Sequence, residues 1–327
     1  MSDSSLKDVV AIGELLIDFI SSGTDAQGNP VMAANPGGAP CNVLSMLARL
    51  GKATGFVGRV GDDIFGRQLR DAISSCGIDS SNLAVDPEVR TTLAFVKTMA
   101  QGEREFSFYR NPGADMRLCE SDVDESYIRQ FKVLHFGTLS STHPGCRAAT
   151  RKALSIAKSA GMLISFDPNL REMLWDDLED ARAEMLYGLA HSDIVKISDN
   201  EIQFLVPDAE DPIVGARKLV EMNPNIKILF ATLGADGAAA LCNGMVVKAP
   251  TFTEIPAVEK TGAGDTFTGA ALAQILDADC GFQFDESRLA DMLKFANAAA
   301  TLCASRKGAL KSMPEREEII SLMEGNL

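Results

Sequence analysis

Short apolar runs alternate with longer amphipathic segments along most of the chain. Strands are predicted at 9–13, 54–60, 133–136, 162–167, 194–197, 227–233 and 244–248. Apolar residues at helical spacing predict helices over 40–50, 65–75, 144–160, 178–191, 200–205, 212–222, 266–276 and 286–305. This alternation indicates a Rossmann-like α/β fold, in which a mainly parallel sheet is covered by helices on both faces.

Two stretches, 14–35 and 90–115, have no helical spacing and alternate strand-like residues with turn signals. The turn signals are Gly23, the string GNP at 28–30 and the string QGE at 101–103. We expect hairpins here. Together they would form one small, discontinuous β lid over the strand ends, where open α/β sheets bind ligands. The α/β core then comprises 1–13, 36–89 and 116–327.

Composition narrows the class of protein. The 327 residues are 46% hydrophobic and carry a formal net charge of -14, so the surface should repel nucleic acid. The seven cysteines are widely spread and form no C-x-x-C pair, which argues against a disulfide framework and a zinc site. No apolar run reaches the roughly 18 residues of a membrane span, and the first residues do not resemble a signal peptide. We expect a cytoplasmic protein that binds neither membrane nor nucleic acid.

The string TGAGD at 261–265 lies between an apolar stretch that looks extended (252–258) and a helix of small residues. Two glycines before a helix N-terminus leave backbone N–H groups available to phosphate oxygens. Asp265 would then orient and deprotonate an attacking hydroxyl, with its pKa lowered by the helix terminus. The alternative is structural, since the glycines would also let the helix pack closely while Asp265 caps it.

Other nucleotide-binding signatures are absent from the sequence. The P-loop pattern G-x-x-x-x-G-K-[ST] does not occur, and no glycine cluster completes G-x-G-x-x-G with an acidic partner. An NAD-dependent oxidoreductase is therefore disfavoured.

Several polar residues follow predicted strands or open predicted helices, where they would share one crevice. Gly37 and Gly38 precede a helix whose first turn carries Asn42, an arrangement that suits a polyol. Asp18 and Arg171 follow strands and would reach the same place. A tight turn explains the glycines equally well, and an isolated Asp after a strand is often only a turn residue.

Two further strands end in groups that suit a nucleotide and its metal. The string KISDNE at 196–201 opens a helix with acids, where capping by Asp199 is the structural alternative, and Glu201 could act on Mg²⁺ through water. The string TLGADG at 232–237 places glycines where a nucleotide could lie flat.

Taken in order, these strings resemble those of the ribokinase-like (phosphofructokinase-B) carbohydrate kinases, and within them those of fructokinases. The resemblance runs from Gly13 to Ala309 and is most specific at PGGAPCN (36–42), GEREFSFYRNPGADM (102–116), FDPNLR (166–171) and TGAGD (261–265). It implies transfer of the γ-phosphate of ATP to the 6-hydroxyl of D-fructose, giving fructose 6-phosphate and ADP. It also implies Mg²⁺ and K⁺ as cofactors, and a homodimer that forms through the lid.

The resemblance implies roles for individual positions. The catalytic base is Asp265, and the anion hole is the backbone of Gly262, Ala263 and Gly264. The sugar-binding positions are Asp18, Gly37, Gly38, Asn42 and Arg171, with Arg110 as a lid residue that closes on the ketose. The positions around the nucleotide are Ser198, Thr232, Gly234, Gly237 and Asn297.

The metal positions depart from the family pattern at two points. Glu201 matches the acid of an N-x-x-E motif that organises Mg²⁺, but the first residue of the motif is Ser198 instead of Asn. The potassium loop maps onto Glu259, Thr261, Ala304, Arg306, Gly308 and Ser312, several of them through backbone carbonyls. Its usual Asp is replaced by Glu259.

Other functions stay open at this point. A 2-keto-3-deoxygluconate kinase would share a lid Tyr-Arg pair but should have an additional basic contact for the acid group of its sugar. A ribokinase lacks the Phe-Tyr-Arg lid string. A non-catalytic, sugar-sensing protein on the same fold belongs to a different functional class.

Overall fold

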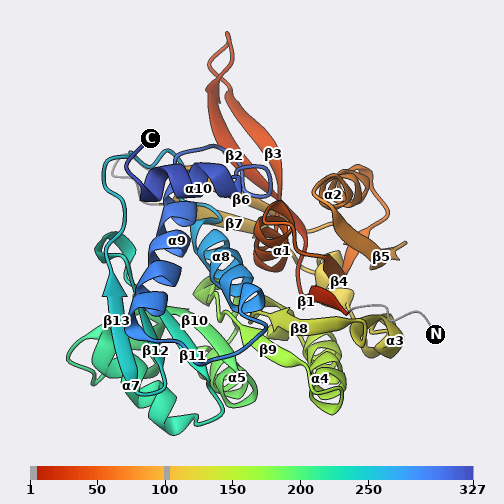
Figure 1. Cartoon of the computed structure of the whole chain (residues 1–327). Helices are drawn as coiled ribbons and strands as arrows, with labels where there is room; N and C mark the ends of the chain where they lie inside the picture. Colours follow the sequence, from red (N-terminus) through yellow and green to blue (C-terminus); the bar gives the residue numbers. More distant parts are fainter. Residues whose placement is uncertain (1–5, 99–103, 327) are drawn as a thin grey trace.

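A nine-stranded sheet forms the centre of the molecule in the computed structural model, which describes residues 6–98 and 104–326 (Figure 1). Its order is β13-β12-β11-β10-β9-β8-β1-β4-β5. The strands are β1 (Lys7–Ile12), β4 (Thr54–Gly61), β5 (Ile78–Asp86), β8 (Phe131–Phe136), β9 (Leu163–Phe166), β10 (Ile194–Ser198), β11 (Ile228–Thr232), β12 (Ala238–Cys242) and β13 (Met245–Ala249). Neighbouring strands from β5 to β11 run parallel, while β12 is antiparallel to both of its neighbours.

Helices cover both faces of this sheet, as the sequence predicted. One face packs against α1 (Ala39–Arg49), α2 (Ile64–Ser75), α8 (Ala263–Asp277), α9 (Glu286–Ala304) and α10 (Arg316–Met323). The other packs against α3 (Glu125–Ile128), α4 (Pro144–Ser159), α5 (Leu178–His191), α6 (Asp199–Leu205) and α7 (Pro212–Met222). Within β1, Val9 and Ala11 enter the first core and Val10 and Ile12 the second, because successive strand side chains point to opposite faces. Short 3-10 helices are η1 (Ala114–Arg117), η2 (Glu120–Asp122), η3 (Leu139–Ser141), η4 (Glu172–Leu174) and η5 (Gly234–Asp236).

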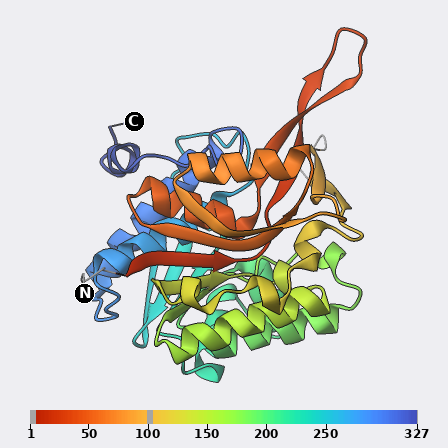
Figure 2. The same ribbon diagram turned by 90° about the vertical axis from the view of Figure 1, so that its right-hand side faces the viewer.

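A separate four-stranded sheet has the order β3-β2-β6-β7. It combines two hairpins that are distant in sequence, β2 (Leu16–Thr24) with β3 (Pro30–Gly37), and β6 (Leu93–Thr98) with β7 (Arg104–Tyr109). Parallel pairing of β2 with β6 joins them. Figure 2 shows the β2–β3 hairpin projecting well beyond the rest of the molecule. We call this sheet the lid sheet; the turn predicted at 101–103 lies outside the described residues.

Four strands and α-helices were not predicted, namely β5, β12, the four-residue α3 and α10. β5 is an edge strand whose sequence IDSSNLAVD is largely polar, and β12 is a run of alanines, so neither has the β-branched character that marks a strand. α10 follows two other helices and was overlooked. The extended stretch predicted at 252–258 was wrong: it forms no strand, and Pro256 removes a backbone donor that a ladder would need.

Across the described residues, every helix is too short or too polar to cross a membrane.

Candidate active site

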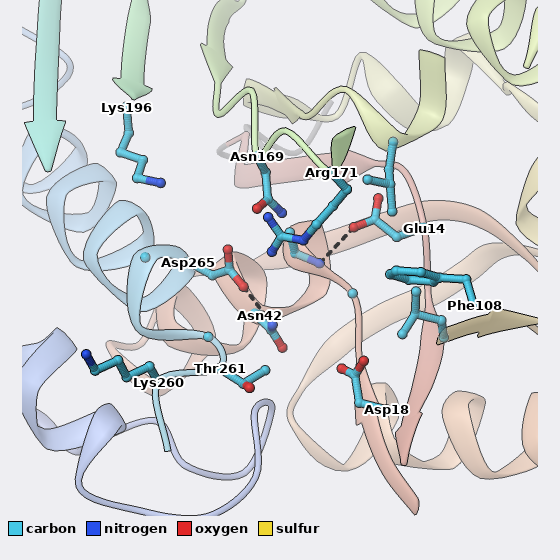
Figure 3. Close-up of a pocket in the computed structure, with 16 residues that line it drawn as sticks. Glu14, Asp18, Asn42, Phe108, Asn169, Arg171, Lys196, Lys260, Thr261 and Asp265 are labelled. Atoms are coloured by element: carbon cyan, nitrogen blue, oxygen red, sulfur yellow. Dashed lines mark hydrogen bonds between the residues drawn. The ribbon is translucent and has the colours of Figure 1, made fainter. Parts of the chain in front are cut away.

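A cavity of about 210 Å³ lies at the carboxyl ends of the parallel strands and beneath the lid sheet (Figure 3). Its walls come from segments that follow β1, β8 and β9, from β10, from the lid strands β2 and β7, and from the starts of α1 and α8. The residues that line it are Glu14, Leu16, Asp18, Gly38, Ala39, Asn42, Phe108, Leu139, Asn169, Arg171, Lys196, Lys260, Thr261, Gly262, Gly264 and Asp265. Most of the predicted sugar-binding and catalytic residues therefore meet in one place.

The floor of the cavity is the start of α8. Gly262 precedes this helix with φ of 81°, a left-handed conformation that favours glycine. Gly262 and Gly264 line the cavity, and the first N–H groups of a helix have no intrahelical acceptor. The turn therefore offers donors and the positive end of the helix dipole to an anion in the cavity.

Asp265 lies in the first turn of α8, with one side facing the cavity and protein around the rest. Its Oδ2 accepts a hydrogen bond of 2.7 Å from the Asn42 amide. Burial, reinforced by the charge of Asp167, raises the pKa of Asp265 to about 6, although Asn42, Lys196 and Arg171 oppose the rise. The expected lowering of this pKa was therefore wrong, because desolvation outweighs the helix terminus. A carboxylate with a pKa near neutrality is a better general base than an ordinary one.

The residues predicted to bind sugar surround Asn42. The Asn42 Oδ1 is buried and has no hydrogen-bond partner within the described part of the chain. Asp18 on β2 lines the cavity beside Gly37, where a Cβ would lie 2.3 Å from the Asp18 Oδ2. A Cβ on Gly38 would lie 2.5 Å from the Glu14 carbonyl oxygen. Both glycines therefore let two strands and a helix approach closely, and Gly38 also keeps the wall open.

The two predicted arginines differ in position. Arg171 lines the cavity, and its Nη1 donates to the Leu170 carbonyl at 3.1 Å. Arg110 is buried outside the lining, where it donates to Asp115 at 2.7 Å, to Thr142 at 2.9 Å and to the Leu139 carbonyl at 3.1 Å. The structure thus does not bring Arg110 to the other sugar-binding residues, and its contact with the ketose stays a prediction.

Glu201 ties together the ends of two strands. One carboxylate oxygen accepts from Leu170 N and the other from Ser198 N, each at 2.8 Å. The Ser198 hydroxyl in turn accepts from Glu201 N at 3.4 Å, which completes a capping box at the start of α6. Each carboxylate oxygen keeps a second lone pair, so these bonds leave room for the predicted water-mediated contact with Mg²⁺. No cluster of three or more His, Cys, Asp or Glu that suits a metal occurs among the described residues.

The positions predicted around the nucleotide do not line this cavity. Thr232 ends β11, and Gly234 and Gly237 bracket η5. A Cβ on Gly237 would lie 2.2 Å from the Ala249 carbonyl oxygen, so this glycine also serves close packing. The Asn297 amide donates to the carbonyls of Ala249 at 3.1 Å and of Pro250 at 3.0 Å and so anchors the loop after β13.

The predicted potassium loop contains one unsatisfied acceptor. Glu259 Oε2 accepts from Gly308 N at 3.2 Å, while its Oε1 is buried with no partner among the described residues. An orphaned carboxylate oxygen of this kind suits a bound cation. Other predicted ligands are already engaged, since the Ala304 carbonyl accepts from two backbone N–H groups, at 2.8 and 2.9 Å. The Ser312 hydroxyl donates to the Ala309 carbonyl at 2.7 Å. The Arg306 side chain is cationic and pairs with Glu318, so only the Arg306 carbonyl could ligate a cation.

Sequence reasoning missed Glu14, Phe108, Asn169 and Lys196 as cavity residues. Glu14 is buried and accepts from Ala39 N at 2.9 Å; burial is the main cause that raises its pKa to about 7. Asn169 has φ of 46°, which is rare outside glycine, and lies two residues before the predicted Arg171. A usable signal existed for Lys196, because it is the one charged residue within the apolar run of β10.

Comparisons with known proteins identify the family of the chain. The model of the pfkB family of carbohydrate kinases matches residues 6–316. Fructokinase-1 of Oryza sativa subsp. japonica is 42% identical over 97% of both chains. The crystal structure of a fructokinase with bound ATP from Xylella fastidiosa has a TM-score of 0.86 and 29% identity, and covers 98% of this chain and 99% of that one.

A double mutant of the Vibrio cholerae O395 fructokinase, solved in a form that binds fructose, ADP and a potassium ion, gives a TM-score of 0.85. It is 30% identical, and the match covers 98% of this chain and 99% of that one. This chain therefore belongs to the pfkB family of carbohydrate kinases.

Proposed function

We propose that this protein is a fructokinase, which transfers the γ-phosphoryl group of ATP to the 6-hydroxyl of D-fructose and releases fructose 6-phosphate and ADP. The observation that carries the proposal is the position of Asp265, which lines the cavity at the start of α8, beside Gly262 and Gly264. Two proteins named fructokinase support the choice of fructose, because they are 42% and 30% identical to this chain over nearly its whole length.

In the reaction, Asp265 accepts the proton of the sugar hydroxyl while the new bond forms between that oxygen and the γ-phosphorus. The bond from the γ-phosphorus to the bridging oxygen breaks, and its electron pair leaves with ADP. The N–H groups at Gly262 and Gly264 offset charge on the transferring oxygens. Asn42 holds the Asp265 carboxylate in place through its amide.

The opposite end of the cavity favours a neutral sugar. Glu14 and Asp18 lie there with Phe108, away from Lys196 and Lys260 (Figure 3). Carboxyl groups hydrogen-bond sugar hydroxyls. The Asp18 carboxylate, and the fraction of Glu14 that is ionised with its pKa of about 7, repel the acid group of 2-keto-3-deoxygluconate. This distribution of charge supports fructose over the acidic substrate.

The cofactors and the oligomer belong to the same proposal. Mg²⁺, held by Glu201 through water and by ATP, would neutralise charge on the phosphates. K⁺ would be held at Glu259 Oε1 and neighbouring carbonyls, where it would order the loop before α8. We place the homodimer contact on the lid sheet.

The test is ATP consumption with fructose, ribose, 2-keto-3-deoxygluconate and adenosine as acceptors in parallel. We expect the highest kcat/KM for fructose. A preference for another of the four would reassign the substrate, and no turnover with any of them would favour the sugar-sensing alternative.

A further inference from the structure

Lys196 is a buried lysine that faces the cavity. It belongs to β10, whose other side chains are mostly apolar, and its side chain is only 9% exposed. Burying an ammonium group is costly unless it is paired. None of the roles described so far explains why this charged side chain is buried beside the cavity.

The ammonium group lies between the Asp167 carboxylate and the turn that begins α8. Its Nζ lies 3.2 Å from Asp167 Oδ2 and 3.3 Å from Asp167 Oδ1. Asp167 is held in turn by the Thr268 hydroxyl of α8, which donates at 3.3 Å. On the other side, a Cβ placed on Gly264 would lie 3.2 Å from the Nζ. Lys196 therefore points toward the turn that offers its N–H groups to phosphate and lies close to Gly264 (Figure 3).

Negative charges surround the Lys196 ammonium, so a cation at this position is electrostatically favourable. Asp265 and Asp167 are both close by, and ATP would add the charge of its γ-phosphoryl group. Burial alone would lower the pKa of Lys196, but the charges of Asp167, Glu201 and Asp265 raise it above its usual value, so the ammonium stays protonated. Of the other cavity cations, Lys260 is exposed and Arg171 already donates to its own loop.

We propose that Lys196 is a catalytic residue, which donates a hydrogen bond to an oxygen of the phosphoryl group as it moves from ATP to the sugar. An ammonium has three donors, and the carboxylate of Asp167 takes at most two of them. The remaining donor adds a fixed positive charge where negative charge is shared between the bridging oxygen and the phosphoryl oxygens. This proposal rests on the kinase function proposed above.

A purely structural role, in which Lys196 only neutralises Asp167, makes a different prediction. Removing both charges of a buried pair is often tolerated, whereas removing one leaves an unpaired charge. The variant Lys196→Met therefore tests the proposal together with the double variant Asp167→Asn/Lys196→Met. The control is Lys227→Met, because Lys227 also pairs with an aspartate at 3.2 Å but lies at the start of β11, outside the cavity.

The experiment measures the affinities of two nucleotides, ADP and the β,γ-imido analogue of ATP, each with Mg²⁺, and kcat with fructose. We expect Lys196→Met and the double variant to bind the imido analogue about tenfold more weakly relative to ADP, because only the analogue has a γ-phosphoryl group. Their kcat should fall about 10²-fold, with the KM for fructose nearly unchanged. Lys227→Met should match the wild type in every measurement.

The outcomes separate the alternatives. If Lys196→Met does not fold, the double variant, which leaves no orphaned carboxylate, decides the question. An unchanged affinity ratio together with a normal kcat in the folded variant would overturn the catalytic role. The nucleotide measurements need no sugar, so they test Lys196 even if fructose is not the acceptor.

Discussion

The corner around Asp265 and the lid sheet are held in opposite ways. In the corner, four residues from separate segments of the core form two pairs: Asn42 donates a hydrogen bond to Asp265, and Lys196 forms an ion pair with Asp167. In the lid, the β2–β3 hairpin is exposed from residue 21 to residue 31. The proposed reacting groups therefore rest on packed elements, whereas the sheet that we propose to cover the sugar has a long exposed hairpin.

This difference predicts which kinetic constant each region controls. Changes in the corner should act on kcat, because its contacts matter most when charge moves in the transition state. Changes in the lid should act on the KM for the sugar and on the exclusion of water.

The largest effect should come from Asp265→Asn, which keeps the shape of the corner but removes the proton acceptor. We expect kcat to fall about 10²-fold or more, while the binding of fructose stays nearly intact. Steady-state kinetics and fructose titration of the folded variant measure both. Turnover close to the wild-type value would refute the role of Asp265.

The pH profile sharpens the description of the same corner. The base must be ionised, so kcat/KM should rise with pH up to about 6, the pKa of Asp265, and level off above it. Asn42→Ala removes the donor that stabilises the carboxylate, so the pKa must rise and the acid limb should move up by about one unit. Asn225→Ala is the control, since the Asn225 amide donates to the carbonyls of Leu189 and Ser192 away from the cavity. If the acid limb of Asn42→Ala coincides with that of the wild type, the Asn42 amide does not control the pKa of the base.

A smaller effect is expected from Phe108→Ala in the lid. Loss of the ring that lines the cavity should raise the KM for fructose about tenfold and increase ATP hydrolysis in the absence of sugar. The matched control is Tyr109→Ala, whose side chain is 65% exposed on the other face of β7. If Phe108→Ala lowered kcat and left the KM for fructose unchanged, the prediction that the lid controls KM and the corner controls kcat would be wrong.

The smallest effect should come from the monovalent cation. Replacing K⁺ by tetramethylammonium should reduce kcat only a few-fold, because a cation at Glu259 acts on the loop before α8 and not on the phosphoryl group. In Glu259→Gln the response to K⁺ should disappear. Equal rates of the wild type in both salts would remove potassium from the proposal.

The sequence predicts much of the fold because the apolar patterns of the buried strands and amphipathic helices are strong. It misses β5 and β12, since an exposed polar edge and a run of alanines do not carry the usual strand signal. The predicted residues in the glycine-rich strings and after strands mostly line one cavity, because parallel strands end at one edge of the sheet.

Electrostatic properties were harder to predict. The pKa of Asp265 depends on its burial and on Asp167, a residue 98 positions away in sequence, so the helix terminus alone gave the wrong sign. Arg110 was placed by its motif, but only the folded chain reveals that Asp115 and Thr142 already bind its guanidinium.

The double attachment of Glu201 has a consequence for mutagenesis. Its carboxylate fastens Leu170, next to Arg171, to Ser198, two residues beyond Lys196. Removing this carboxylate would free both strand ends at once. We therefore expect the affinity for the sugar and the affinity for the phosphates of ATP to fall together. A Glu201 variant with a low kcat therefore need not have lost a Mg²⁺ site. Added Mg²⁺ should restore only part of its kcat.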